Sequence, residues 1–132
     1  AENSALGMYA LYNNTSGGQN TAVGESALIA NTTASNNVAV GKSALEANTT
    51  GANNIAMGTG AVQNNTTGSS NVGLGYQALL SNTTASNNTA VGYQAGYSNL
   101  TGISNVFVGE SAGRSFQESS QTKQGCVRME PR

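Results

Sequence analysis

Few side chains in this 132-residue chain could carry out catalysis or bind a metal. The sequence has no His and no Asp, and its only Cys is Cys126. A Ser–His–Asp or Cys–His nucleophile is therefore excluded, and the usual ligand sets for zinc, haem and iron–sulfur clusters are missing. We predict no enzymatic activity, no catalytic residue, no cofactor and no metal site. The glutamates outside the C-terminal segment lie scattered in turn-like stretches, as solvated surface charges do: Glu2, Glu25, Glu46 and Glu110.

Asn-x-Ser/Thr triplets recur along the chain and could accept N-linked glycans. A column of glycans along one edge of the protein is one hypothesis. The alternative, which we favour, is that these Asn and Thr side chains stack as hydrogen-bonded turn ladders. The candidate glycan acceptors are Asn14, Asn31, Asn48, Asn65, Asn82 and Asn99.

Two other residue types could bind a ligand. Paired threonines form a column at Thr32–Thr33, Thr49–Thr50, Thr66–Thr67 and Thr83–Thr84. Flat ranks of Thr on a β-solenoid suit ice binding, although these pairs lie in turn-like, Asn-flanked segments. Tyrosines are the large amphipathic side chains and could stack on sugars, but the sequence alone assigns them no site. They are Tyr9, Tyr12, Tyr76, Tyr93 and Tyr97.

All these candidates are positioned by one internal repeat of 17 residues. Asn recurs at this step from Asn3 to Asn105, and we number each unit from position 1 at this Asn to position 17. Position 5 is Gly and position 8 is Ala in all seven units, and position 12 is Asn in six. An array without insertions predicts a solenoid, because stacked coils tolerate no slip in register. The markers of four central units are Asn20, Gly24, Ala27, Asn37, Gly41, Ala44, Asn54, Gly58, Ala61, Asn71, Gly75 and Ala78.

Each unit predicts one or two short strands and no long helix. Positions 2 and 4 are mostly β-branched or apolar and alternate with a small residue at position 3, so we expect positions 2 and 4 to point inward. Gly at position 5 ends the strand, where a positive φ or a close backbone approach is required. Positions 6–9, as in ESAL or YQAL, return Ala and usually Leu to the interior. The NTTG and NTTASN segments predict turns.

Composition excludes two classes of partner. Charged residues are 8% of the chain, against about 25% in typical globular domains. The net charge of −1 leaves no electrostatic footprint for nucleic acid. No apolar run approaches the roughly 20 residues of a membrane span. We predict neither nucleic-acid binding nor membrane insertion.

The sequence divides into a repeat array over residues 3–115 and a non-repeat segment over residues 116–132. The second segment lacks the marker residues and holds five of the eleven charges. A cap against end-on stacking, a tail and the start of another domain all fit it. Its Cys126 is either a free thiol or a link between chains.

The phrase N-x-A-V-G-x-x-A-L, spaced by N-T-T-G or N-T-T-A, resembles the repeat arrays of bacteriophage tail fibres and related bacterial surface fibres. Those arrays often precede an endosialidase-type intramolecular chaperone. The phrase is also similar to the head repeats of trimeric autotransporter adhesins, whose unit is shorter. The resemblance covers residues 3–115. It implies a trimeric fibre segment that forms or displays a receptor-binding surface, with Val23 and Val40 in its core and Gly24 and Gly41 in its turns.

These observations predict an all-β protein, a β-solenoid (β-helix or β-roll) of seven 17-residue coils. Because one such coil encloses little apolar volume, we favour a trimer of identical chains that share a core, with a single-chain triangular solenoid as the alternative. The expected function is a structural and adhesive segment of an extracellular fibre, at a cell surface or on a virion, with a cell-surface glycan as receptor. The alternatives are a self-assembling, glycosylated filament subunit and an ice-binding solenoid.

Overall fold

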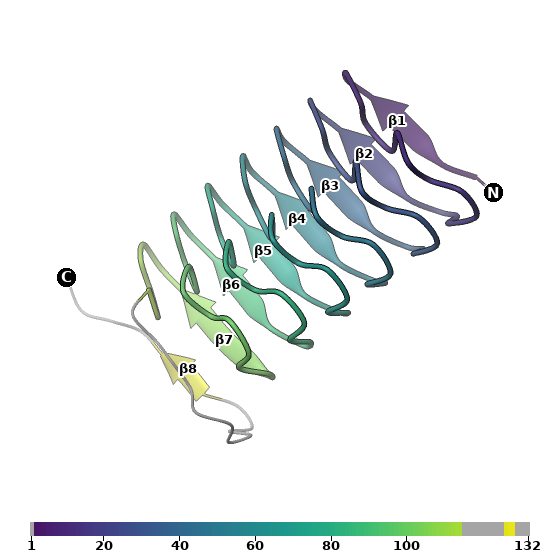
Figure 1. Cartoon of the computed structure of the whole chain (residues 1–132). Coiled ribbons are helices and arrows are strands. Elements are labelled where there is room, and N and C mark those ends of the chain that lie inside the picture. The colour runs from purple at the N-terminus through teal and green to yellow at the C-terminus, as the bar shows by residue number, and fades with distance from the viewer. Residues whose placement is uncertain (1, 115–125, 129–132) are drawn as a thin grey trace.

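The computed structural model describes residues 2–114 and 126–128 and shows a parallel β-solenoid, drawn out as a rod in Figure 1. The all-β solenoid prediction is confirmed. Eight short strands form one sheet in chain order. They are β1 (Ser4–Leu6), β2 (Thr21–Val23), β3 (Val38–Val40), β4 (Ile55–Met57), β5 (Val72–Leu74), β6 (Thr89–Val91), β7 (Asn105–Val108) and β8 (Cys126–Arg128).

The 17-residue period of the sequence sets the register of the sheet. From β1 to β7, each strand pairs in parallel with the residues 17 positions later, as in Ala22 with Ala39. The last pairing has a longer step, because Asn105 of β7 pairs with Cys126 of β8. The predicted non-repeat segment 116–132 otherwise lies outside the described residues.

Hydrogen bonds join neighbouring coils around their whole circumference, outside the strands as well as within them. The Leu28 N–H donates to the Ala44 carbonyl at 3.1 Å, and the Asn53 N–H donates to the Ser35 carbonyl at 3.2 Å. Because buried backbone groups must be paired, a coil of this small size is stable only when it is stacked on another. This ladder is the reason that no unit varies in length.

Glycine at position 5 is required both by the backbone angle and by the next coil. The position 5 glycines that follow β1–β7 have φ between 121° and 135°, a range that L side chains rarely adopt. A Cβ on Gly58 would lie 2.5 Å from the carbonyl oxygen of Gly75. The predicted turn is confirmed, and the close approach comes from the equivalent glycine one coil further on.

The strand side chains face the opposite way from the prediction. Ala at position 3 faces inward, with Ala22, Ala39, Ala56 and Ala90 fully buried, whereas positions 2 and 4 face outward. The prediction that Val23 and Val40 lie in the core is therefore wrong, since both are on the outer side of their strands. The size of the inward residue is matched to the opposite wall: a Cβ on Gly73 would lie 2.5 Å from Val62 Cγ2.

The apolar core is a column of Ala and Leu enclosed within one chain. Position 8 Ala and position 9 Leu are buried as predicted, including Ala27 with Leu28 and Ala44 with Leu45. The expectation that one coil is too small to enclose a core is wrong, because small side chains at positions 3 and 8 let the walls approach closely. Any association between chains is added outside this core.

Near β7 the large and small core residues exchange places. Phe107 occupies position 3, where the other strands have Ala or Gly, while Gly96 and Gly113 occupy position 9, where Leu or Val is usual. A Cβ on Gly96 would lie 2.7 Å from Phe107 Cδ2, and the three nearest atoms to a Cβ on Gly113 are also Phe107 ring atoms. The aromatic ring fills the volume that two leucine side chains vacate.

This exchange can be tested with a double-mutant cycle. Phe107→Ala should lower the free energy of unfolding by about 3–5 kcal/mol, the usual cost of a large cavity. Gly113→Leu in the Phe107→Ala background should recover part of that loss, since Leu28, Leu45 and Leu79 have φ of 51–53° at the same position, close to the 65° of Gly113. Gly113→Leu alone should destabilise by overpacking. Additive effects in urea denaturation would show that the two sites do not share volume.

The glycine column gives a second test. Gly58→Val should disrupt folding, because the new side chain meets the Gly75 backbone and the φ of 130° is unfavourable. Thr59→Val, one residue along and exposed, is the matched control and should change the melting temperature little. Equal melting temperatures of the two variants, followed by circular dichroism, would contradict the steric role of position 5.

Candidate functional site

The most specific arrangement of polar groups is a buried column of asparagines at position 1. The backbone N–H of Asn37 donates to Asn20 Oδ1 at 3.0 Å, and the backbone N–H of Asn54 donates to Asn37 Oδ1 at 2.9 Å. The same bond continues to Asn105. Each amide oxygen thus caps the beginning of the next coil's strand.

Position 12 forms a parallel column in which one side-chain amide donates to the previous one. Asn48 Nδ2 donates to Asn31 Oδ1 at 3.2 Å, and Asn65 Nδ2 donates to Asn48 Oδ1 at 2.8 Å. These side chains are fully buried. The sequence predicted hydrogen-bonded ladders of Asn, and the structure places them inside the coil.

The two columns meet at the carbonyl of position 15. Gly51 O accepts from Asn37 Nδ2 at 3.0 Å and from Asn48 Nδ2 at 2.9 Å. Gly68 O accepts in the same way from the next two asparagines, both at 2.9 Å. In the described part of the chain no buried side-chain nitrogen or oxygen lacks a partner. The interior therefore combines an amide network with the apolar core, and no charged side chain is buried among the described residues.

This geometry corrects the glycan hypothesis for the folded protein. Asn31, Asn48, Asn65, Asn82 and Asn99 are buried, and each Nδ2 already makes two hydrogen bonds. A glycan on Nδ2 would remove a donor and require space that the neighbouring coils occupy. Asn14 is half-buried, and its Nδ2 donates to Gly17 O.

The threonine pairs separate into two different environments. At position 13 the hydroxyl donates to the carbonyl one coil further on, as in Thr49 Oγ1 to Thr66 O at 3.1 Å. This bond runs from coil to coil, as the predicted turn ladder requires. Position 14 is exposed, as at Thr50 and Thr67. One column of hydroxyls, not two, is available to an ice surface.

The repeat markers assemble into columns and not into a reactive cluster. The position 1 Asn and position 8 Ala residues are buried, and the position 5 Gly residues form the strand ends. Within the described residues no three His, Cys, Asp or Glu side chains come together. The markers therefore hold the coil together.

Sequence reasoning missed the surface that the inverted strands create. We call it the outer strand face: positions 2 and 4 of β1–β7, exposed or half-buried and without a charged side chain. Met57, for example, is 45% exposed. The members are Ser4, Leu6, Thr21, Val23, Val38, Val40, Ile55, Met57, Val72, Leu74, Thr89, Val91, Val106 and Val108. The absence of charge at these positions was the available signal.

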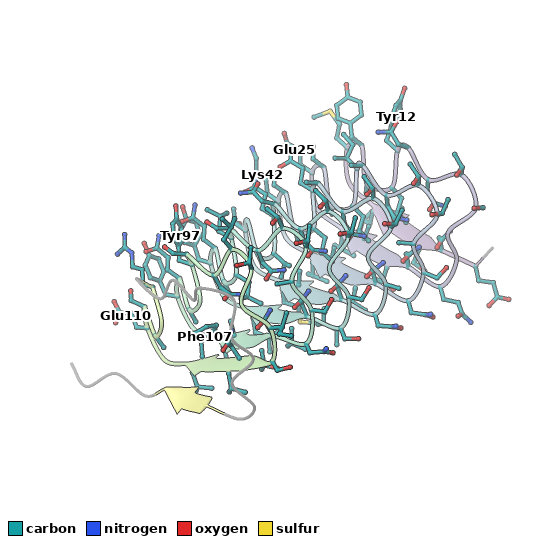
Figure 2. The ribbon with its side chains drawn as sticks, turned by 60° about the horizontal axis from the view of Figure 1, so that its bottom comes forward. Tyr12, Glu25, Lys42, Tyr97, Phe107 and Glu110 are labelled. Atoms are coloured by element: carbon teal, nitrogen blue, oxygen red, sulfur yellow. The ribbon has the colours of Figure 1, made fainter. Side chains whose placement is uncertain are left out.

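Charged and aromatic side chains gather away from the strands. In Figure 2, Tyr12, Glu25, Lys42 and Tyr97 lie along the edge of the rod opposite the sheet. Lys42 Nζ is 3.2 Å from Glu25 Oε2, an exposed ion pair that stabilises little. The Tyr76 and Tyr93 rings stack with centroids 5.3 Å apart. The molecule thus has an apolar side and a mixed polar and aromatic side.

No protein family model, curated protein or solved structure matches this chain. Among the described residues, none forms a helix with the length and apolar character that crossing a membrane requires. The arguments about function that follow rest on the geometry.

The ladder can be tested at Asn65, with its exposed neighbour Asn64 as control. Asn65→Ala removes the acceptor of Asn82 Nδ2 and the donors to Asn48 Oδ1 and Gly68 O. Unsatisfied buried groups of this kind cost about 1–3 kcal/mol each, so we expect a loss of about 2–4 kcal/mol in free energy of unfolding. Asn64→Ala should cost less than about 0.5 kcal/mol. Similar denaturation midpoints for the two variants would contradict the structural role of the ladder.

Proposed function

We propose that this chain is a structural and adhesive segment of an extracellular fibre, which spaces and presents binding surface without catalysis. The observation that carries the proposal is the constant register: each strand from β1 to β7 pairs with the next at a step of 17 residues. Such a scaffold extends by adding coils and leaves its outward positions free to vary. Outward position 6, for example, is Glu25, Lys42, Thr59 and Tyr76 in successive coils.

We further propose that identical chains associate through the outer strand face to form a trimer. This face is uncharged, and a second copy offers the same columns at the same strand spacing. Six steps of about 4.8 Å along the rod and three residues across it give a face of roughly 300 Å². This is less than half of the roughly 800 Å² per partner in a standard interface. Association of this length of array is therefore expected to be reversible and to depend on concentration.

Sedimentation velocity over a range of concentrations tests the assembly. Wild-type protein should pass from monomer to a discrete trimer, and Met57→Lys should shift it toward monomer because the charge would be desolvated in the interface. Thr50→Lys, exposed on another side, should leave association unchanged. Equal melting temperatures at low concentration would show that both variants fold. A wild-type monomer at every concentration, or association unaffected by Met57→Lys, would refute assembly through this face.

A second candidate is a self-assembling filament of identical chains, since the coils stack in register along a single axis. In the same sedimentation experiment, open-ended polymers in place of a discrete trimer would support the filament.

A further inference from the structure

The part of each coil formed by positions 11–17 carries no charge. Between Asn13 and Ser104 these positions hold neither a charged nor an aromatic residue. The charged side chains of residues 3–114 all lie at positions 6 and 10, namely Glu25, Lys42, Glu46, Glu110 and Arg114. Positions 11–17 are therefore chemically distinct from the edge with the charged and aromatic side chains and from the apolar outer strand face.

Two columns of polar side chains are exposed in this part of the coil, and together we call them the turn face. Positions 15 and 16, which separate the two columns, are only Gly, Ala or Ser in the first five coils. No large side chain therefore stands between the columns in those coils. The exposed residues are Ser16, Thr33, Thr50, Thr67, Thr84 and Thr101 at position 14, and Gln19, Asn36, Asn53, Ser70 and Asn87 at position 17.

The polar groups of the turn face are not used by the protein itself. At position 13 the threonine hydroxyls donate to carbonyls, as in Thr49 Oγ1 to Thr66 O. Within the described part of the chain, by contrast, the position 14 hydroxyls and the side-chain amides of Asn36, Asn53 and Asn87 make no hydrogen bond. These hydroxyls and amides are left to bond with whatever lies outside the rod.

The backbone under the turn face is fixed from coil to coil. Next to position 14, the Thr49 N–H donates to the Thr66 carbonyl at 2.9 Å, and at position 17 the Asn53 N–H donates to the Ser35 carbonyl at 3.2 Å. The φ of position 17 stays between 57° and 63° in all six coils. A surface ordered in advance loses little conformational entropy when it binds.

A rigid, uncharged array with a constant step suits a ligand that is itself a regular lattice. The coils repeat at about 4.8 Å, close to the distance between equivalent oxygen atoms in the basal plane of ice. Sites for small ligands such as sugars are concave and lined by apolar and aromatic side chains, and positions 11–17 have no aromatic residue.

We propose that the turn face binds ice. The Thr methyl and hydroxyl groups of position 14 and the amide and hydroxyl groups of position 17 would hold water molecules at positions that match the lattice. This activity is separate from the proposed fibre function, and it uses a part of the rod that assembly through the outer strand face leaves uncovered.

Thermal hysteresis, the gap between the melting and freezing temperatures of a small ice crystal, tests the proposal. The wild-type protein should produce a larger gap than serum albumin at the same concentration. Thr50→Lys and Asn53→Lys should each remove most of it, because a strongly hydrated ammonium group would disturb the ordered water. Both positions are exposed, and Gln19 and Ser70 show that position 17 accepts residues other than Asn at the same φ.

Thr59→Lys is the matched control, because it adds the same charge at exposed position 6, in the column of Glu25 and Lys42. It should keep the wild-type hysteresis, and equal melting temperatures by circular dichroism should show that all the variants fold. A wild-type gap no larger than that of albumin, or full hysteresis in both Thr50→Lys and Asn53→Lys, would overturn the proposal.

Met57→Lys separates ice binding from assembly. This variant should associate less but keep its hysteresis, whereas Thr50→Lys should associate normally and lose it. Loss of hysteresis in Met57→Lys with retention in Thr50→Lys would place the activity on the outer strand face and would refute a role for the turn face.

Discussion

The fold depends on side-chain amide hydrogen bonds that link each coil to the next. A coil of 17 residues is too narrow to exclude polar backbone from its interior, so carbonyls such as Gly51 O face inward and need donors. Asn at positions 1 and 12 supplies them, and each Asn is itself satisfied by the adjacent coil. An unpaired polar group in such an interior is costly. An insertion of one residue would break every bond of both columns at that level, which explains the invariant period.

The narrow coil also determines where the large apolar residues lie. Inside, there is room for Ala on the strand and for one Leu on the opposite wall, as in Ala39 and Leu45. The Val, Ile and Met residues of the strands are therefore on the outside, where an ordinary sheet would have polar groups. The result is an uncharged outer face of roughly 300 Å², comparable with the largest apolar patch on a typical monomer. The core satisfies the chain's own stability, and the outer strand face is available for association.

Much of this could be predicted from the sequence, because the repeat fixes register. The period, the strand at positions 2–4, the positive φ of position 5 and the inward Ala and Leu of positions 8 and 9 all follow from residue type and spacing. Which side of the strand faces inward does not follow from the sequence. Alternation shows that the two sides differ, but not which of them fits the width of the coil. For that reason the prediction places Val40 inside and Ala39 outside, the reverse of the structure. The exchange of size between Phe107 and the two glycines Gly96 and Gly113 depends on contacts between coils, and no single unit shows it.

The same ladder has a mechanical consequence. Each coil is bonded only to its two neighbours, so a load applied at the ends of the rod does not strain all the bonds together. The load acts mainly on the coil at which it is applied. It would detach that coil before it strains the next one. Each release would free 17 residues, which span at most about 60 Å when extended. A rod built in this way would lengthen in equal increments under tension and absorb work at each increment.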